Sequence, residues 1–409
     1  MSPTDQGEGT MIKQLNHLLL TTVEDPYDIK SWSGIPVALR AALEKNIEKL
    51  TVFRPGPPSR HPVDVARRLW YGGTPPKYPL WMTNASLRKN AVQVKAEIMR
   101  TNPDAVLSIS SQCIAHLNNP GRPVFLFADA PWLSWQEAYE GTISKTIRKV
   151  WFAEQEAKAA RRIDGLCFGS SWAIDEAEQK YRSGPLDTSI RKRLHITPLG
   201  ANWTPRLSRQ ELLDCVDSRP VGKLELLYVG KDWIRKGGPM AVEVAKLLRM
   251  SGHRVQLHIV GCRPELPPET ASYVKVHGLL YQSNASENAL LEELFLRSHF
   301  LIVPTLAECF GIVFAEAQAF GLPPIARAVH ALPSVIADGE SGILMDPAAP
   351  ASAYVERILA LLSDRAEYRK MAVRARDRYE NTLNWDSTAK KLIYLMAQKV
   401  ATPNLMEPS

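Results

Sequence analysis

The chain has 409 residues, 45% of them hydrophobic and 23% charged, with a net charge of +7 at pH 7. This composition is typical of a globular protein with room for two domains of ordinary size. No window approaches the roughly 18 uninterrupted apolar residues of a membrane-spanning helix, and the N-terminus lacks an apolar core, so we expect neither a spanning helix nor a secretory signal.

Cysteine usage points to a reducing compartment. The five cysteines are odd in number, widely spaced and without a CxxC pair. This pattern argues against a disulfide framework or a zinc site, so we expect no metal site and a cytoplasmic location. Cys309 has no histidine close to it in the sequence, and we interpret it as a small packing residue rather than a nucleophile.

The positive charge is unevenly distributed. Residues 1–205 contain 26 Lys and Arg against 20 Asp and Glu, whereas the remainder contains 24 against 23. Such an excess indicates an anionic partner of the first half, either a phosphate-bearing acceptor or the inner face of an anionic membrane in peripheral contact. A contribution to solubility alone is the alternative. No nucleic-acid-binding motif occurs, so we expect no nucleic-acid partner.

In the first half, apolar runs predict strands, and periodic apolar residues predict helices between them. Strands are expected at 16–23, 49–53, 106–109, 124–127, 165–169 and 194–198, with helices from residue 35, within 61–100 and over 145–162. Ser33 is the expected N-cap of the first helix. The aromatic residues within 61–100 suit sugar rings, a lipid interface or core packing; they are Trp70, Tyr71, Tyr78 and Trp81.

Asp129 comes directly after the strand expected at 124–127. Ligands bind at the carboxyl ends of strands in a parallel sheet, so Asp129 is a candidate catalytic carboxylate that faces a cleft. A carboxylate at this position also serves as a turn or helix cap, and the sequence leaves both interpretations open.

A polar stretch over about 204–222 is the expected linker between two halves. Beyond it, strands are predicted at 224–229, 255–260, 274–278, 300–303 and 324–326, helices at 290–298 and 312–320, and a helical tail over 354–400. This alternation of strands and helices favours a parallel α/β sheet in the second half as well.

The loop at 230–238 follows a predicted strand and combines Lys231, Arg235 and Lys236 with three glycines. Glycines let the backbone approach a ligand closely, and cations on a strand-to-helix turn suit a phosphate group. A solvated basic loop without a ligand is the alternative.

Residues 304–345 form the most informative stretch. A loop after the strand at 300–303 carries Glu308, and the following helix carries Glu316, with seven residues between the two carboxylates. Spacing alone also permits Glu316 to lie on the solvated face of its helix.

Taken in order, these landmarks resemble the Glu-x7-Glu signature of the retaining glycosyltransferases of family 4, also called group 1. The resemblance rests on Glu308-Cys309-Phe310-Gly311, Glu316-Ala317, Gly321-Leu322-Pro323, Asp338-Gly339, Gly342, Trp32-Ser33-Gly34, Ser170-Ser171-Trp172, Leu199-Gly200-Ala201-Asn202, the loop at 230–238 and Asn384-Trp385-Asp386. It implies the GT-B fold, an α/β fold with two facing Rossmann-like domains, parallel sheets and a C-terminal helix that crosses back to the first domain. The implied acceptor-side domain is 1–205 with about 385–409, and the donor-nucleotide domain is 206–384.

The resemblance also implies an enzyme that transfers a sugar from a UDP- or GDP-type nucleotide sugar, with retention, without a metal ion and without a cofactor beyond this donor. The implied acceptor is a sugar, a lipid-linked sugar or a polysaccharide, in polysaccharide or glycolipid assembly. Lys236 and Lys231 would neutralise the departing diphosphate. Glu308 would hold sugar hydroxyls or balance positive charge on the sugar, and Glu316 would bind the ribose. Further donor-side residues are Arg235, Phe310, Gly311, Ile312 and Gly34. At Asp129, a candidate catalytic residue, many family members have a histidine instead.

Other functions remain compatible with the sequence. A sugar-nucleotide epimerase or hydrolase with the GT-B fold would need no acceptor. A phosphorylase-like enzyme would need a pyridoxal lysine, for which no matching context occurs. A non-catalytic sugar-binding module would have no chemical need for Lys236 and the two glutamates.

Overall fold

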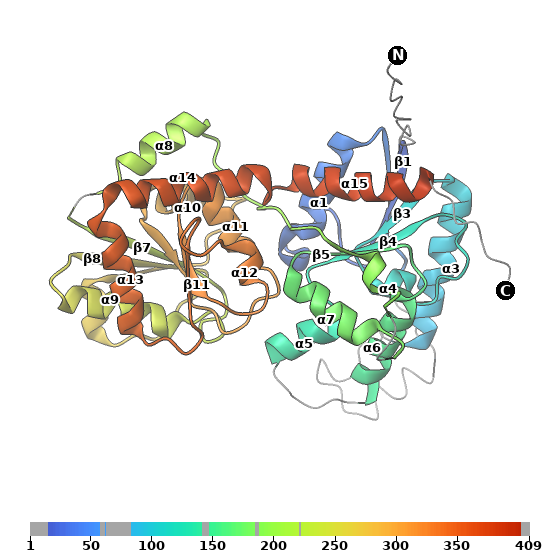
Figure 1. The fold of residues 1–409 in the computed structure, drawn as a ribbon, viewed down its shortest axis with the longest axis horizontal. Coiled ribbons are helices and arrows are strands. Elements are labelled where there is room, and N and C mark those ends of the chain that lie inside the picture. The colour runs from blue at the N-terminus through green and yellow to red at the C-terminus, as the bar shows by residue number, and fades with distance from the viewer. Residues whose placement is uncertain are drawn as a thin grey trace, which may run out of the picture.

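The computed structural model describes residues 15–57, 62, 83–140, 147–184, 188–220 and 222–401. These residues form two six-stranded sheets, in the orders β2-β1-β3-β4-β5-β6 and β12-β11-β10-β7-β8-β9. All paired strands are parallel. Figure 1 shows the sheets as two separate units with helices on both faces of each.

The first sheet and its helices come from the N-terminal half of the chain. Its strands are β1 (His17–Thr21), β2 (Lys49–Phe53), β3 (Ala105–Ser108), β4 (Val124–Ala128), β5 (Gly165–Phe168) and β6 (Leu194–Ile196). Its helices are η1 (Ser31–Gly34), α1 (Ile35–Asn46), α3 (Asn84–Thr101), α4 (Ser111–Ile114), α5 (Trp132–Glu140), α6 (Ile147–Ala160), α7 (Ser171–Tyr181) and η3 (Arg191–Arg193).

The second sheet follows helix α8 (Arg209–Asp217). Its strands are β7 (Leu224–Val229), β8 (Val255–Val260), β9 (Val274–Gly278), β10 (Phe300–Ile302), β11 (Pro324–Arg327) and β12 (Ile343–Met345). The helices are α9 (Gly238–Met250), η4 (Pro268–Ser272), α10 (Ala285–Arg297), α11 (Ile312–Ala319), α12 (Leu332–Val335), α13 (Ala351–Ser363), α14 (Arg365–Asn381) and α15 (Trp385–Ala401).

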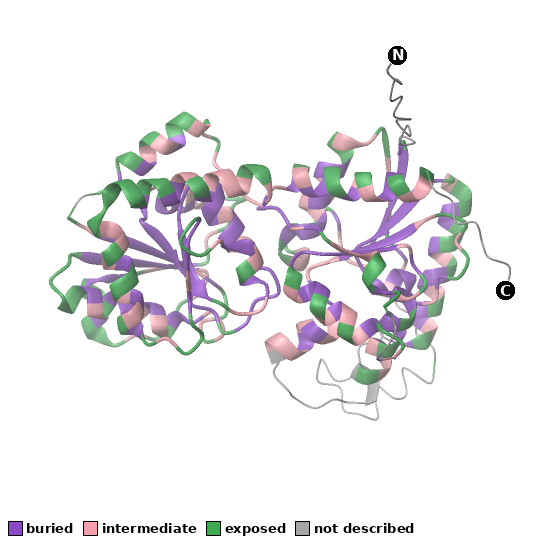
Figure 2. Ribbon diagram, in the orientation of Figure 1, coloured by how far each residue is buried: buried purple, intermediate pink, exposed green. Residues whose placement is uncertain are grey.

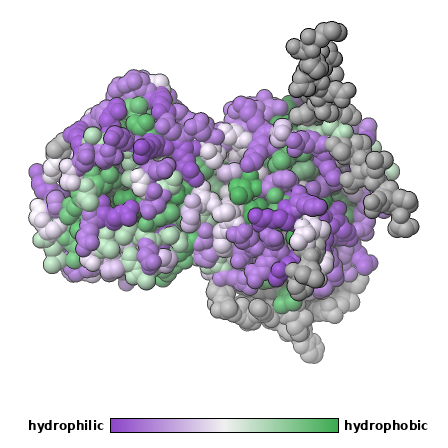
Figure 3. Space-filling model, in the orientation of Figure 1, coloured by the Kyte–Doolittle hydropathy of each residue, from purple (hydrophilic) through white to green (hydrophobic). Residues whose placement is uncertain are grey.

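The central strands are apolar along most of their length because helices cover both faces of each sheet. Every residue of β1, β3 and β10 is buried. In Figure 2 the buried residues run through the middle of both units, and the exposed residues lie on the outer surfaces of the helices. Figure 3 shows mostly hydrophilic side chains over this face, with hydrophobic residues in smaller groups.

Helix α15 joins the two units. In Figure 1 it continues the line of α14 and lies over the first sheet, where it packs against α1. The Asn46 side-chain amide donates to Asp386 at 2.6 Å, and the Thr388 hydroxyl donates to the Pro198 carbonyl at 2.6 Å. With the two parallel sheets, this crossing helix confirms the predicted fold class.

Two local predictions were wrong. The N-cap of α1 is Gly34, at φ +82°, and Ser33 lies in the preceding turn at φ +56°. The expected linker contains α8, because Ser208 and Glu211 form a capping box that starts a helix there. The Glu211 carboxylate accepts from the Ser208 N–H at 2.7 Å, and the Ser208 hydroxyl accepts from the Glu211 N–H at 3.3 Å.

Two further predictions concern membranes and aromatic surfaces. Among the helices in the described ranges, none is long and apolar enough to cross a bilayer. The aromatic residues proposed for sugar or lipid contact lie outside the described residues; these are Trp70, Tyr71, Tyr78 and Trp81.

Candidate active site

The strand order of the second sheet reverses between β7 and β10. From β7 the chain moves outward through β8 and β9, whereas from β10 it moves the other way through β11 and β12, and β7 and β10 are neighbours. In such sheets ligands bind beyond the carboxyl ends of the strands where the order reverses. The basic loop follows β7 and the Glu308 loop follows β10, so the two loops flank this point.

Backbone contacts join these two loops. The Leu306 N–H donates to the Arg235 carbonyl at 2.7 Å, and the Thr305 hydroxyl donates to the same carbonyl at 3.1 Å. At Gly237 the backbone has φ +74°, and a Cβ atom there would lie 2.0 Å from the Pro304 carbonyl oxygen. The close approach therefore requires glycine at this position.

Three charged side chains meet between the loops. The Lys236 ammonium pairs with the Glu308 carboxylate, and Arg235 Nη1 lies 4.0 Å from Glu308 Oε2. Arg235 Nη1 also donates to the Ala307 carbonyl at 2.9 Å. Glu308 is only 5% exposed, and a carboxylate this buried needs paired charge and hydrogen bonds.

Tyr139 reaches this cluster from the first domain. Its hydroxyl donates to Glu308 Oε1 at 3.0 Å and accepts from the Cys309 N–H at 3.2 Å. Arg235 lies over the Tyr139 ring, 4.4 Å from its centroid. Burial and the nearby negative groups raise the pKa of Tyr139, so it keeps its proton and acts as a hydrogen-bond donor. Tyr139 thus connects α5 of the first unit to the carboxylate of the second.

The N-terminus of α11 lies beside Glu308. Gly311 is its N-cap at φ +88°, and a Cβ atom there would lie 2.9 Å from Glu308 Cγ and 2.5 Å from the Phe314 ring. Only glycine fits this conformation and this space. The first N–H groups of a helix have no partner within the helix, so this terminus favours an anion.

The predicted donor-side residues Phe310 and Ile312 flank Gly311. The Phe310 ring is 2% exposed and packs against Gly169 of the first unit, so a donor contact at Phe310 would involve its backbone. Ile312 is half-buried.

Glu316 lies one turn into α11, rather than the two turns that the sequence indicated. Burial raises the pKa of Glu316 to about 8, against a backbone hydrogen bond from Trp203 and the charge of Lys236, which both lower it. Glu316 is half-buried and is not on a fully solvated helix face. Its carboxyl group is therefore largely protonated at pH 7 when no ligand is bound.

Asp129 lies on the first-domain side of the cluster. Burial raises the pKa of Asp129 to about 6, and the charge of Glu308 acts in the same direction. Its carboxylate accepts from the Ala130 N–H at 2.9 Å and from the Trp32 side chain, and both contacts oppose this rise. The contact with the Ala130 N–H matches the turn interpretation of Asp129, and its catalytic role stays a prediction.

The loop after β1 is strained where it meets Asp129. Trp32, Ser33 and Gly34 follow one another at φ +38°, +56° and +82°. A left-handed conformation costs a bulky residue such as tryptophan about 1–2 kcal/mol. Asn202 donates to the Ser33 carbonyl and accepts from Trp385 Nε1, so α15 helps to hold this loop.

The structure places several of the predicted site residues close to Glu308. Those that touch one another or Glu308 are Lys236, Arg235 and Gly311, and Asp129 and Glu316 lie within their electrostatic reach. Lys231 is exposed and forms no hydrogen bond or ion pair with another described residue. Of the described His, Cys, Asp and Glu residues, no group of three or more is placed to hold a metal ion.

Sequence reasoning did not assign Tyr139 or His330 to the site, and it used Trp32 only as part of the turn Trp32-Ser33-Gly34. His330 has φ +45°, and its ring lies 5.0 Å from that of Trp172 of the first domain. Its buried Nδ1 has no hydrogen-bond partner among the residues that the structure describes. For Tyr139 a signal existed. Trp132, Trp135 and Tyr139 have helical spacing directly after the strand end that carries Asp129.

If this cluster is catalytic, Tyr139→Phe should lower kcat about tenfold while the protein stays folded. The substitution removes one hydrogen bond to a charged group and leaves the Cys309 N–H without its acceptor, but keeps the ring under Arg235. Steady-state kinetics and thermal unfolding measure both effects. Tyr273→Phe is the control, because Arg249 lies over that ring at 5.7 Å away from the cleft. Equal kcat values for the two variants would contradict the prediction.

The fold and the cleft define a two-domain α/β protein of the GT-B type. A sucrose-phosphate synthase from Thermosynechococcus elongatus has a TM-score of 0.63 at 19% identity, over 94% of this chain and 99% of that one. The Anabaena protein HepE in complex with UDP has a TM-score of 0.57 at 12% identity, over 94% and 100%. Likeness at this level of identity shows the shared fold alone.

Residues 216–378 match the family model described as glycosyl transferases group 1. A D-inositol 3-phosphate glycosyltransferase from Thermomonospora curvata is 30% identical over 179 residues, which are 41% of this chain and 41% of that protein. The match thus spans less than half the length of that relative. The stretch that matches the family model includes Arg235, Lys236, Glu308 and Glu316.

Proposed function

We propose that this protein is a retaining glycosyltransferase of family 4 that moves a sugar from a UDP- or GDP-type nucleotide sugar to an acceptor without a metal ion. The observation that carries this proposal is the cluster of Lys236, Arg235 and Glu308 beside the N-terminus of α11, at the reversal point of the second sheet. A diphosphate placed there would meet two cations and a helix N-terminus. The UDP named in the HepE structure supports a nucleotide as the donor.

The proposed roles follow from charge development in the reaction. Departure of the nucleotide places negative charge on the diphosphate and positive charge on the sugar. Lys236 would leave its ion pair with Glu308 in part and stabilise the diphosphate. Glu308 would then hold sugar hydroxyls and balance the positive charge, with Tyr139 keeping its carboxylate in place. Asp129, near Glu308, would accept a hydrogen bond from a substrate hydroxyl.

Donor recognition would use the remaining donor-side groups. Glu316 would accept hydrogen bonds from the ribose hydroxyls. Lys231, exposed on the basic loop, would contact the diphosphate after the donor binds. The backbone of Gly311 and Ile312 would contribute N–H groups, and Gly34 would let the loop after β1 approach the donor.

For the acceptor side we propose the first domain, 1–205 with about 385–409, and for the donor side 206–384. The relative's name specifies an inositol phosphate, a polyol that bears a phosphate, and this supports an anionic sugar or polyol acceptor. Lipid-linked sugars and polysaccharides are the other proposed acceptors, and they too present sugar hydroxyls. We propose a cytoplasmic site of action, because all five cysteines are free and such thiols suit a reducing compartment.

The test of this function is nucleotide release from a panel of UDP- and GDP-sugars, with and without cell extract as the acceptor source. We expect one donor to be turned over rapidly only when acceptor is present. Isomerisation of the donor without acceptor would instead identify an epimerase, and acceptor-independent release would identify a hydrolase. Binding of a donor without any turnover would identify a sugar-binding module.

We expect transfer to survive treatment with EDTA. The motivation is the pair of cations on the basic loop, Arg235 and Lys236, next to the position proposed for the diphosphate. Initial rates in EDTA and in added Mg²⁺ or Mn²⁺ should agree within about twofold, because cationic side chains would supply the charge stabilisation. Loss of activity in EDTA that Mg²⁺ or Mn²⁺ restores would refute the metal-independent mechanism.

A further inference from the structure

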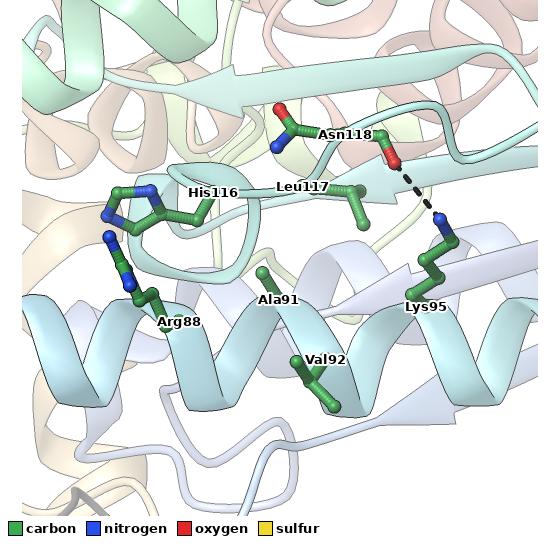
Figure 4. Close-up of a pocket in the computed structure, with 7 residues that line it drawn as sticks. All are labelled: Arg88, Ala91, Val92, Lys95, His116, Leu117 and Asn118. Atoms are coloured by element: carbon green, nitrogen blue, oxygen red, sulfur yellow. Dashed lines mark hydrogen bonds between the residues drawn. The ribbon is translucent and has the colours of Figure 1, made fainter.

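A cavity lies on the first unit, away from the proposed active site. It has a volume of about 390 Å³ and lies between α3 and the segment that follows α4. In Figure 1, α3 is on the side of the first sheet that faces away from the second unit. Figure 4 shows Arg88 and Lys95 rising from α3 towards His116 and Asn118 of the opposite wall.

The cavity is cationic. Arg88 and Lys95 line it, and Arg162 holds its wall through hydrogen bonds from Nη1 to the Asn118 side chain at 2.6 Å and from Nη2 to the Ala115 carbonyl at 2.7 Å. None of these three cations pairs with a carboxylate among the described residues. Lys95 has a single long hydrogen bond to the Asn118 carbonyl, at 3.4 Å.

His116 lies in positively charged surroundings. Its Nε2 atom is buried and has no hydrogen-bond partner in the described structure. Burial lowers the pKa of His116, and every charge that contributes is a cation, in the order Arg88, Arg162 and Lys158. An anion bound beside His116 would offset the charge of these cations and favour the protonated ring. The protonated ring could then donate a hydrogen bond from Nε2 to the anion.

The floor of the cavity is apolar. Ala91, Val92 and Leu117 form it, and Val92 is 69% exposed. An inorganic anion would leave these apolar side chains exposed to water. The organic part of a phosphate ester would cover them, which is favourable. The cavity thus combines cations at its rim with an apolar surface of moderate size.

We propose that this cavity binds the phosphate group of an organic phosphate ester, with Arg88 and Lys95 contacting the phosphate and the organic part resting on Ala91, Val92 and Leu117. The carrier is either a soluble phosphate ester or a phospholipid headgroup, which share this chemistry. Binding of either carrier does not require the transferase reaction. The test of this site is therefore independent of the test of the proposed function.

The binding test uses the full-length protein, without donor or sugar acceptor, titrated with glycerol 3-phosphate and with inorganic phosphate at constant ionic strength. Calorimetry measures affinity, and NMR of the histidine ring signals, assigned with His116→Gln, follows His116. We expect glycerol 3-phosphate to bind and to raise the pKa of His116. We expect Arg88→Gln with Lys95→Gln to weaken this binding about a hundredfold, since each charge-assisted contact contributes about tenfold.

The matched control is Arg122→Gln with Lys192→Gln, which removes the same charge from exposed positions of the first unit outside the cavity. We expect it to bind as the unmodified protein does. Equal weakening in both double variants would overturn the proposal, because binding would then follow net charge alone. An unchanged His116 pKa at saturation would overturn it as well.

Vesicles distinguish the two carriers. Sedimentation is measured with phosphatidylglycerol vesicles and with phosphatidylcholine vesicles. Salt-sensitive pelleting with the anionic vesicles alone, lost in the Arg88→Gln, Lys95→Gln variant and kept in the control, assigns the site to a lipid headgroup. Binding of glycerol 3-phosphate without pelleting assigns it to a soluble ester. Absence of both refutes the site.

Discussion

Lys236→Ala should lower kcat about a hundredfold, with a smaller change in the donor KM. The ammonium group of Lys236 pairs with the carboxylate of Glu308, and Glu308 lies beside the N-cap of α11, where the diphosphate is proposed to bind. Negative charge grows on the diphosphate only as the glycosidic bond breaks, so this cation acts mainly in the transition state. Loss of one such preorganised contact typically costs about 3 kcal/mol.

The measurement is donor-saturation kinetics on Lys236→Ala and on Lys231→Ala. Lys231 lies on the same loop but is exposed and outside the ion-pair cluster, so we expect its loss to raise the donor KM with little change in kcat. Removing Lys236 also leaves Glu308 without its main partner in a buried position. Lys236→Ala with Glu308→Gln removes this unpaired charge. Because Glu308 belongs to the same proposed site, the double variant is compared with Glu308→Gln alone. If the two are equally stable but the double variant has the lower kcat, the loss at Lys236 is catalytic. Unchanged kcat in Lys236→Ala would place the diphosphate elsewhere.

Glu316→Gln should weaken donor binding in a manner that depends on pH. The pKa of Glu316 is about 8 without ligand, whereas ribose hydroxyls donate hydrogen bonds best to the ionised carboxylate. Donor binding therefore favours ionisation, so below pH 8 the donor must expel a proton and its affinity falls about tenfold per pH unit. At pH 9 the glutamate is ionised, and the variant should have a donor KM about tenfold higher than the unmodified protein.

Towards pH 6.5 the two proteins should converge, because a protonated glutamate resembles glutamine in its hydrogen bonding. Calorimetry of UDP binding at pH 7 in buffers of different ionisation enthalpy should show release of about one proton, absent in Glu316→Gln. A constant ratio of KM values across this pH range would exclude titration of Glu316 in donor binding. Loss of kcat with donor affinity intact would mean that Glu308 and Glu316 exchange their proposed roles.

Local sequence patterns were sufficient for the fold class. The strands β1 and β10 are buried on both faces, so nearly all of their residues must be apolar. Such apolar runs can be recognised in the sequence. The alternation of strands with helices then restricts the chain to parallel α/β units. Errors arose at element ends. The capping box of Ser208 and Glu211 lies in a polar stretch, and its polarity hid a helix start.

The sequence by itself determined that Lys236, Glu308 and Glu316 belong to loops and a helix start at strand ends, because parallel sheets place such residues at one edge. Only the tertiary structure decided which charges meet. Lys231 and Lys236 lie on the same loop, and the structure shows that Lys236 pairs with Glu308 whereas Lys231 is exposed. Tyr139 lies far from Glu308 along the chain but supplies its hydrogen bond across the cleft. The pKa of Glu316 depends on burial by segments that are distant in the sequence, and so do the contacts between the domains. Burial of this kind produces no local sequence pattern.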